Sequence, residues 1–280
     1  MSIKSSESSN LVEITSRSST FPNFSEAWRH HGLAVMLVQR NIKLRYAQTI
    51  LGAIWVIIQP LLLTGTLALV LGAMLALPSD GSPYVLFVFS GTVLWSAFQR
   101  VVNETSVSMV GSVNLISKIY FPRVLVPISG AFTVIVDILP AYLLLVLVVG
   151  LYGMLPGWPI LLSPIFLLLI LLLGLAIGFW VTMIDAIYRD VRMIVPAVLQ
   201  LGFFLTPVMY SDSAVPRKWE LIYSLNPLVG FLRAFRWSVI AGVAPPGILE
   251  LLWGTAVVLV LLASGLAIFA RLEQFAVDRI

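Results

Sequence analysis

The chain has 280 residues, of which 59% are hydrophobic and only 11% are charged, and its mean hydropathy is +1.00. A soluble domain carries about a quarter charged residues, so this composition excludes an ordinary soluble fold and indicates several membrane spans. The absence of cysteine excludes disulfide scaffolds, thiolate metal sites and cysteine nucleophiles, and the net charge of +4 matters less than its distribution.

The first 48 residues divide into a tail and a helix. Residues 1–22 are rich in serine and lack an apolar core, so we expect a disordered cytoplasmic tail rather than a signal peptide. Residues 23–48 predict an amphipathic helix that lies in the membrane surface, with Arg29, Arg40 and Lys43 on its polar face. Apolar and aromatic side chains recur on its other face at three- and four-residue steps: Phe24, Trp28, His31, Val35, Val38, Ile42 and Tyr46.

Residues 49–280 predict one transmembrane domain, so the expected fold class is an all-α integral membrane protein. Runs of about 20 apolar residues are long enough to cross a bilayer. The sequence contains six candidates: 53–77, 84–107, 124–151, 160–184, 193–210 and 249–270. The fifth is short and holds Pro196 and Pro207, so we expect it to be kinked.

The positions of the basic residues predict the orientation of these spans. Most of the 17 lysines and arginines precede the first span, follow the last one, or lie near the connections between spans two and three and between spans four and five. The other side carries only Arg217, Lys218, Arg233 and Arg236. Because basic loops stay in the cytoplasm, both termini are predicted to be cytoplasmic.

The third outer loop, Ser211 to Gly247, does not look like an ordinary loop. Its stretch "NPLVGFLRAFRWSVIAG" is too apolar to be exposed and too short and charged to span the membrane. We therefore expect a re-entrant or interfacial helical hairpin in the outer leaflet.

The chain lacks the motifs of ATP hydrolysis and of common hydrolases. It contains no G-x-x-x-x-G-K-[ST] loop, no H-E-x-x-H and no G-x-S-x-G. A chain without a phosphate loop is not expected to hydrolyse ATP by itself. Its two histidines, His30 and His31, are adjacent on the interfacial helix, where surface roles are favoured over metal ligation.

Arg100, Glu104 and Asp137 are ionisable residues within predicted spans, where charge is costly. For Asp137, in span three, we expect a polar partner on a neighbouring helix and a role in packing. Arg100 and Glu104, near the inner end of span two, are four residues apart, which predicts a local ion pair.

Two cytoplasmic connections combine charge with aromatic residues. They are "NLISKIYFPRVLVPIS" (114–129) and "AIYRDVRMIVP" (186–196). Together they predict an inner surface that suits a protein partner. The aromatic residues of the spans are expected in interfacial belts or in packing, but a passage lined by them would suit sugars, whose rings have apolar C–H faces.

Four stretches of the sequence resemble one family. They are "LRYAQTILGAIWVIIQPLL" (44–62), the stretch 114–129, "YRDVRMIVPAVLQLGFFLTPVMYS" (188–211) and "LNPLVGFLRAFRW" (225–237). Their order and content resemble the ABC-2 type permeases that export polysaccharides, namely O-antigen, capsule and teichoic acid. The resemblance extends from about Trp28 to the end of the chain.

The resemblance implies a short coupling helix, about Gly111 to Ile119, that docks on a separate ATPase subunit. It implies a working unit of two permeases and two ATPases, with ATP and Mg bound by the ATPase and no cofactor, metal or nucleic acid bound by this chain. The implied coupling residues are Asn114, Leu115, Ile116, Lys118, Tyr120, Phe121, Pro122, Arg123, Arg189 and Asp190.

The resemblance also implies a cargo, a lipid-linked polysaccharide, which crosses the bacterial inner membrane through a channel between the two permeases. The outer hairpin would supply gate helices. Residues implied at the junction of the interfacial helix with span one are Trp28, Arg45, Tyr46, Gly52, Trp55 and Pro60. Residues expected at the channel or gate are Phe87, Trp95, Phe98, Phe204, Tyr210, Asn226, Phe231, Arg233, Phe235 and Trp237.

Two other functions remain open at this point. Related ABC-2 permeases move drugs, lipids or other amphipathic compounds, so the cargo rests on analogy. A membrane-bound glycan-lipid transferase is a more distant alternative. It would need acidic residues or histidines clustered at the membrane surface, where the sequence offers only the isolated Asp190 and Asp212.

Overall fold

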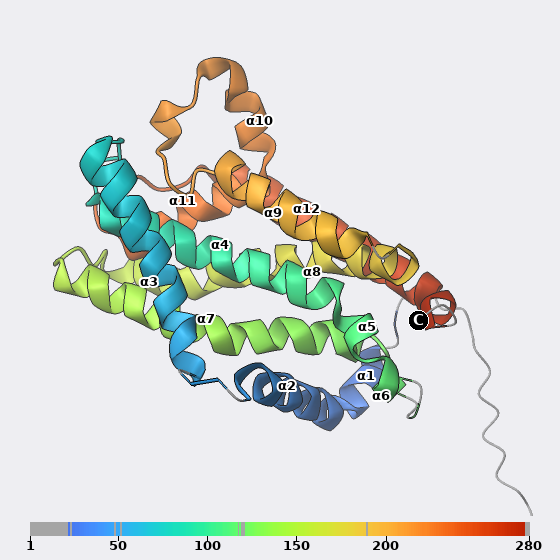
Figure 1. Cartoon of the computed structure of the whole chain (residues 1–280). Helices are drawn as coiled ribbons and strands as arrows, with labels where there is room; N and C mark the ends of the chain where they lie inside the picture. The colour runs from blue at the N-terminus through green and yellow to red at the C-terminus, as the bar shows by residue number, and fades with distance from the viewer. Residues whose placement is uncertain are drawn as a thin grey trace, which may run out of the picture.

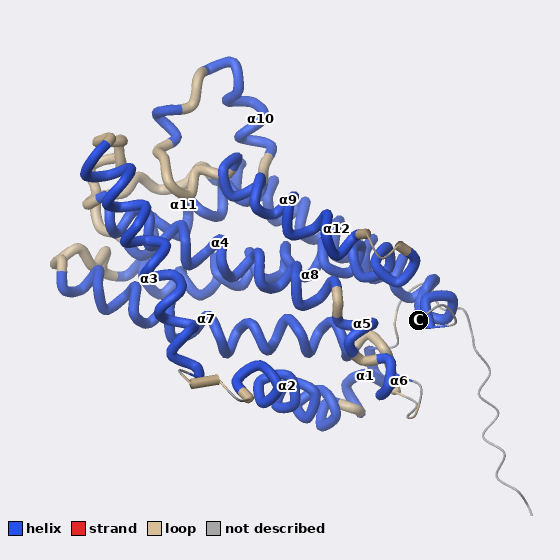
Figure 2. Tube along the Cα trace, in the orientation of Figure 1, coloured by secondary structure: helices blue, strands red, loops and turns tan. Residues whose placement is uncertain are grey.

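The computed structural model describes residues 22, 24–47, 49–50, 52–116, 118, 121–188 and 190–277. Every regular element in these segments is helical, which confirms the all-α fold class (Figure 2). The elements in chain order are α1 (Phe24–Arg29), α2 (His31–Tyr46), η1 (Gly52–Ile54), α3 (Trp55–Leu67), the π-helical η2 (Ala68–Met74), α4 (Tyr84–Ser106), α5 (Ser108–Gly111), α6 (Val113–Ile116), α7 (Leu125–Leu151), η3 (Trp158–Leu162), α8 (Ser163–Ile187), α9 (Val191–Leu205), η4 (Asp212–Ala214), η5 (Arg217–Trp219), α10 (Glu220–Leu225), α11 (Pro227–Val239) and α12 (Ile248–Val277).

Five helical segments in the described part of the chain are long and apolar enough to cross a membrane. They are Trp55–Met74, Tyr84–Ser106, Leu125–Leu151, Trp158–Ile187 and Ile248–Leu272. They correspond to the first four and the sixth of the spans expected from hydropathy.

The remaining expected span, 193–210, contains a shorter helix. Helix α9 has 15 residues and ends at Leu205. The following residue, Thr206, is extended with φ −95° and ψ 140°, because Pro207 disfavours a helical conformation in the residue before it. A helix of this length spans about 22 Å, which is less than the roughly 30 Å of a hydrocarbon core.

Helix α4 forms the centre of the bundle and packs against α3, α7 and α8 (Figure 1). In the most apolar part of α4, 78% of the residues are buried, against 17% in the segment of α3 and η2 and 17% in α12. Glycines on α8 let α4 and α8 approach each other closely. A Cβ atom added at Gly178 would lie 2.5 Å from the Cβ of Thr105 on α4. Small residues allow this close packing where water supplies no driving force.

At one end of the bundle, buried hydrophobic side chains from several helices form a cluster. It contains Ala27 of α1, Leu37 of α2, Met109 of α5, Phe179 of α8 and Phe269 of α12, together with the beginning of α7. Figure 1 shows α1, α5, α6 and the C-terminal end of α12 near this end of the molecule. The N-terminal helices, α5, α6 and the adjoining ends of α7, α8 and α12 are therefore packed as one unit, which we call the coupling end.

The N-terminal helical region lies where the sequence predicts it, and its placement in the membrane surface stays a prediction. The expected single helix is divided into α1 and α2 at His30. Ala27 and Leu37 are buried against the protein, while Trp28 and Val35, on the face predicted to meet lipid, are 77% and 53% exposed. Residues 1–21 of the expected tail lie outside the described residues.

The region from 211 to 247 contains two helices of different placement. Helix α10 extends away from the bundle (Figure 1), whereas α11 packs against α4, α8 and α12. The α11 helix begins with Pro227, and the side chain of Asn226 caps it by accepting a hydrogen bond from the Leu228 amide at 3.1 Å.

Candidate functional site

Four polar side chains meet where α2 ends. Arg45 forms ion pairs with Glu104 on α4 and with Asp137 on α7. The hydroxyl of Tyr46 donates a hydrogen bond of 2.7 Å to Asp137 Oδ1. Because the side chain of Asp137 is only 1% exposed, its charge is matched from within the protein. We call these four residues the junction cluster.

The junction cluster confirms one expectation and corrects another. Asp137 has the polar partners on a neighbouring helix that its position in span three predicted. The predicted local pair between Arg100 and Glu104 is wrong. Glu104 pairs with Arg45, and Arg100 donates a hydrogen bond of 2.8 Å to Gln59 Oε1 on α3. Glu104 and Arg100 are thus bound by residues of α2 and α3, respectively, and not by each other.

The other predicted junction residues follow α2 and lead into α3. Gly52 has φ +50°, a conformation that favours glycine. Pro60 is buried inside α3, whereas Trp55 is 44% exposed and Trp28 lies exposed on α1. The structure brings only Arg45 and Tyr46 of this predicted set into the junction cluster.

The predicted coupling helix, about Gly111 to Ile119, overlaps α6 and the last residue of α5, and residues 117 and 119 lie outside the described residues. Helices α5 and α6 are separated by Ser112, whose backbone amide bonds to the Met109 carbonyl at 3.1 Å. Leu115 of α6 packs against the hydrophobic cluster of the coupling end. The segment is therefore anchored to the ends of the long helices.

The predicted coupling residues differ in exposure. Lys118 is exposed, Phe121 is 4% exposed, and Pro122 and Arg123 are partly buried. Tyr120 and Arg189 lie outside the described residues, as do the side chains of Asn114 and Ile116.

The connection between α8 and α9 is fixed by an ion pair. Arg192 Nε lies 2.8 Å from Asp185 Oδ1, and the side chain of Asp185 is 1% exposed. The predicted coupling residue Asp190 is exposed beside this pair. The pair holds the start of α9 against the end of α8, so the two connections on this side of the bundle are both attached to buried groups.

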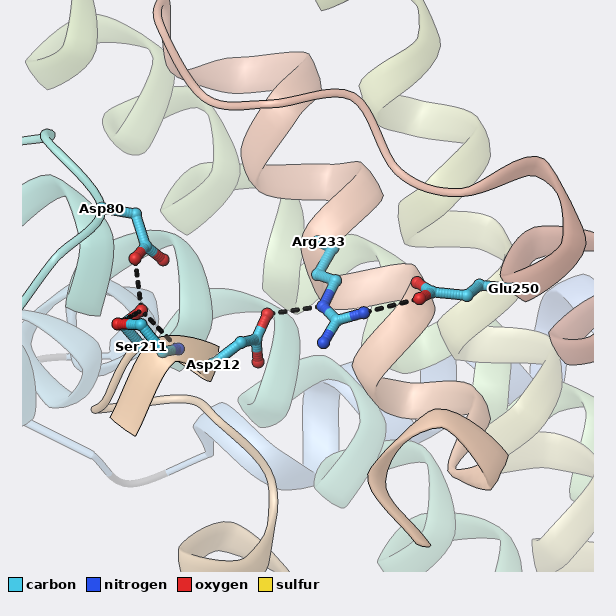
Figure 3. A network of polar contacts seen from close by, with 6 residues as sticks. Asp80, Ser211, Asp212, Arg233 and Glu250 are labelled. Carbon is cyan, nitrogen blue, oxygen red and sulfur yellow. Dashed lines mark hydrogen bonds and ion pairs between the residues drawn. The ribbon is translucent and has the colours of Figure 1, made fainter. Parts of the chain in front are cut away.

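A second polar group, the Arg233 network, lies around α11 (Figure 3). Arg233 Nε is 2.5 Å from Asp212 Oδ2, and its Nη1 is 2.7 Å from Glu250 Oε1 in the first turn of α12. Beside it, the hydroxyl of Ser211 donates to Asp80 in the loop before α4 (Figure 3). The network joins four separate segments of the chain.

The charge of Arg233 is stabilised by this network. Partial burial lowers the pKa of its guanidinium, but hydrogen bonds and charges from Asp212 and Glu250 outweigh burial, and the pKa is raised. The group therefore remains a cation that can hold both carboxylates.

Arg236, one turn further along α11, is buried among apolar helices. Its guanidinium carbon lies 3.6 Å from the centre of the Phe87 ring, and its Nη2 donates to the Val208 carbonyl at 2.8 Å. Burial lowers the pKa of Arg236 to about 9, so it stays charged at neutral pH. A cation over a ring face and a carbonyl acceptor replace the carboxylate that a buried arginine usually has.

The residues predicted for a channel or gate fall into two groups. Phe87, Trp95, Phe98, Phe231 and Phe235 are at most 5% exposed and pack between helices of the single chain. Phe204 is 56% exposed, while Tyr210, Asn226, Arg233 and Trp237 are partly buried. A passage lined by these side chains stays a prediction.

Several polar residues of these sites were not singled out from the sequence. They are Asp80, Asp185, Ser211, Arg236 and Glu250. A charged residue among apolar ones was the available signal for Asp185 and Arg236, but their partners come from other helices. The described segments contain no group of three or more histidine, aspartate or glutamate side chains that could hold a metal ion.

Comparison with known proteins identifies a family. The family model described as ABC-2 type transporter matches residues 33–240, which includes the junction cluster, the two cytoplasmic connections and α11.

Three named relatives cover nearly the whole chain. The chain is 31% identical to the O-antigen export system permease protein RfbA of Myxococcus xanthus, over 90% of this chain and 96% of the relative. It is 26% identical to the protein of the same name from Klebsiella pneumoniae, over 86% and 92%. It is 24% identical to the polysialic acid transport protein KpsM of Escherichia coli, over 85% and 92%.

Proposed function

Because the chain belongs to the ABC-2 type transporter family, we propose that it is the permease subunit of an exporter that moves a lipid-linked polysaccharide, such as O-antigen, across the bacterial inner membrane. The observation that carries this proposal is the similarity to an O-antigen export permease over 90% of the chain. The relative named for polysialic acid transport supports the same class of cargo. Five long apolar helices in the described residues agree with a multi-pass membrane subunit.

The energy for export would come from a separate ATPase subunit. The segment around α5 and α6 is the proposed docking element, because it is short, carries the exposed Lys118 and is anchored in the coupling end. Movement of this segment would reach α7, α8 and α12 through the shared hydrophobic cluster. The working unit would contain two copies of this chain and two ATPases.

In the proposed topology both termini are cytoplasmic and α9, with residues 206–210, completes a sixth span. This is supported by the gathering of α1, α5 and the C-terminal end of α12 at the coupling end. Helix α11 would be re-entrant from the outer face, where its polar edge meets the Arg233 network. The pair of helices α10 and α11 would then form the exit gate.

Deletion of the gene in its native host tests this function. We expect the surface polysaccharide to disappear and lipid-linked polysaccharide to accumulate inside, with both restored by the wild-type gene. The purified chain should show no ATP turnover until its ATPase is added. Normal surface polysaccharide in the deletion strain, or ATP turnover by the chain alone, would overturn the proposal.

A further inference from the structure

A polar cavity of about 360 Å³ opens between α3 and α4. Its volume lies within the range of about 300–1,000 Å³ that is usual for small-molecule sites. Five of its lining residues carry polar side chains. The two helices that supply them are otherwise apolar enough to lie in the membrane interior. The main lining residues are Gln59, Leu63, Ser96, Gln99, Arg100 and Asn103.

Such a concentration of polar groups is costly in a membrane helix, so a functional role is expected for it. On α4 the polar lining residues lie three and four positions apart, so they share one face of the helix. That face lies in the part of α4 that leads to α5 and to the coupling end. The cavity is thus placed on the same side of the bundle as the junction cluster.

Arg100 gives the cavity its positive charge. Its Nη2 donates to Gln59 Oε1 at 2.8 Å, which uses one of the five N–H groups of a guanidinium. The carboxylates of the junction cluster, Glu104 and Asp137, are both paired with Arg45. The remaining donors of Arg100 can therefore bind an anion, and a guanidinium fits the oxygens of a phosphate.

The other polar side chains match the chemistry of a sugar. Amide groups of Gln59, Gln99 and Asn103 can both donate and accept hydrogen bonds, as can the hydroxyl of Ser96. Neighbouring hydroxyls of a pyranose need both roles. Outside the cavity, α3 exposes Leu61 and Leu62, against which an acyl or prenyl chain could lie.

We propose that this cavity binds the phosphate-linked end of the lipid-linked glycan, with Arg100 on the phosphate and the amide side chains on the first sugar. The proposal rests on the proposed function and adds the position at which the cargo is held. Because Glu104 on the same helix pairs with Arg45, an occupant of the cavity would lie next to the group that joins α2 to the spans.

Binding to the full chain in lipid nanodiscs tests this site, with a fluorescent polyprenyl diphosphate disaccharide as the probe. We expect Arg100→Gln to weaken binding at least tenfold, because charge-assisted hydrogen bonds to phosphate are lost. The matched control, Arg40→Gln, removes the same charge from an exposed position on α2 and should leave binding within twofold. Both variants should keep the unfolding temperature of the wild type.

Further arms separate the phosphate from the sugar and from ordinary lipid. Asn103→Leu should weaken binding of the disaccharide probe but not of a polyprenyl diphosphate without sugar. Inorganic pyrophosphate should compete weakly. If an equal concentration of phosphatidylglycerol displaces the probe, the cavity is a general phospholipid site and the proposal is overturned.

The result for Arg100 also distinguishes this proposal from the proposed function. If the wild type fails to bind the probe, or Arg100→Gln binds it as the wild type does, the cavity assignment is wrong. The proposed function would still stand if the deletion strain lacks surface polysaccharide and the wild-type gene restores it. Loss of export with Arg100→Gln in that strain, with normal protein levels, supports both.

Discussion

Arg45, in the last turn of α2, pairs with Asp137 in the middle of α7. The pair forms where the chain leaves the N-terminal helices and enters α3, and Glu104 adds a contact to α4. A tilt of α2 cannot occur without strain on two long helices. The junction cluster is thus a mechanical connection between the coupling end and the bundle.

Replacement of Arg45 by alanine should destabilise the protein strongly. Asp137 would remain as a buried charge with only Tyr46 as its partner. Loss of one partner from a buried pair costs about 3–5 kcal/mol, and we expect the lower end because the Arg45 side chain is 23% exposed. Chemical unfolding of the purified chain would measure the loss.

The exposed Arg40→Ala on the same helix provides the matched control and should change stability little. The double variant Arg45→Ala/Asp137→Asn should be more stable than Arg45→Ala alone, since the unpaired charge is removed with its partner. Equal stability of these two variants would mean that the unpaired Asp137 carboxylate is not what destabilises Arg45→Ala. Wild-type stability of Arg45→Ala would mean that the pair contributes nothing to the fold.

The junction cluster also marks the limit of what sequence patterns predict. Hydropathy located the long helices, because burial in lipid requires continuous apolar runs. Spacing placed Arg100 and Glu104 on one helical face, but it could not tell that α2 and α3 bring competing partners to each of them. Tertiary contacts decided the pairing.

The N-terminal helices show a similar limit. Periodicity predicted a helix whose apolar face includes Trp28 and Val35, but it did not show that Ala27 and Leu37 pack against the protein. A helix at a membrane surface can meet lipid on one side and protein on another, and both sides are apolar. The pattern alone does not say which side faces α7.

A change at Lys118 should uncouple the ATPase without damage to the fold. Lys118 is exposed after α6, so Lys118→Ala removes a surface charge and little packing. We expect ATP hydrolysis by the reconstituted complex to lose most of its stimulation by the permease, while membrane insertion is normal. Lys43→Ala, exposed on α2, is the control and should leave ATP hydrolysis unchanged.

Phe121→Ala, unlike Lys118→Ala, should destabilise the fold. Phe121 is 4% exposed in the cluster of the coupling end, so its truncation should cost about 3–5 kcal/mol and reduce the amount of folded protein. If Lys118→Ala leaves both transport and stimulated ATP hydrolysis intact, α5 and α6 are not the coupling element.

The Arg233 network should control export more than stability. Arg233→Met removes both ion pairs, but these side chains are about 30% exposed, so each pair contributes only about 0.2–1 kcal/mol. We expect a several-fold change in export of surface polysaccharide, because α11 is released from Asp212 and Glu250. Assembly with the ATPase, measured by co-purification, should not change.

Arg217→Met provides the control for Arg233→Met, since Arg217 is exposed on η5 and carries the same charge. It should leave export as in the wild type. Loss of the complex in Arg233→Met would assign the network to assembly rather than to a gate.

Gly178 on α8 offers a test of the bundle centre. A methyl group at this position would lie 2.5 Å from Thr105 Cβ and 2.6 Å from Thr105 Cγ2, so α4 and α8 must move apart. Overpacking of this kind costs about 1–3 kcal/mol, which offsets or exceeds the roughly 1 kcal/mol that alanine adds to helix propensity. Gly178→Ala should therefore lower the free energy of unfolding in detergent.

Gly65→Ala on α3 makes the same chemical change where no atom lies within 4 Å, and it should be neutral or stabilising. Equal effects of the two substitutions would show that close packing of α4 on α8 does not support the fold.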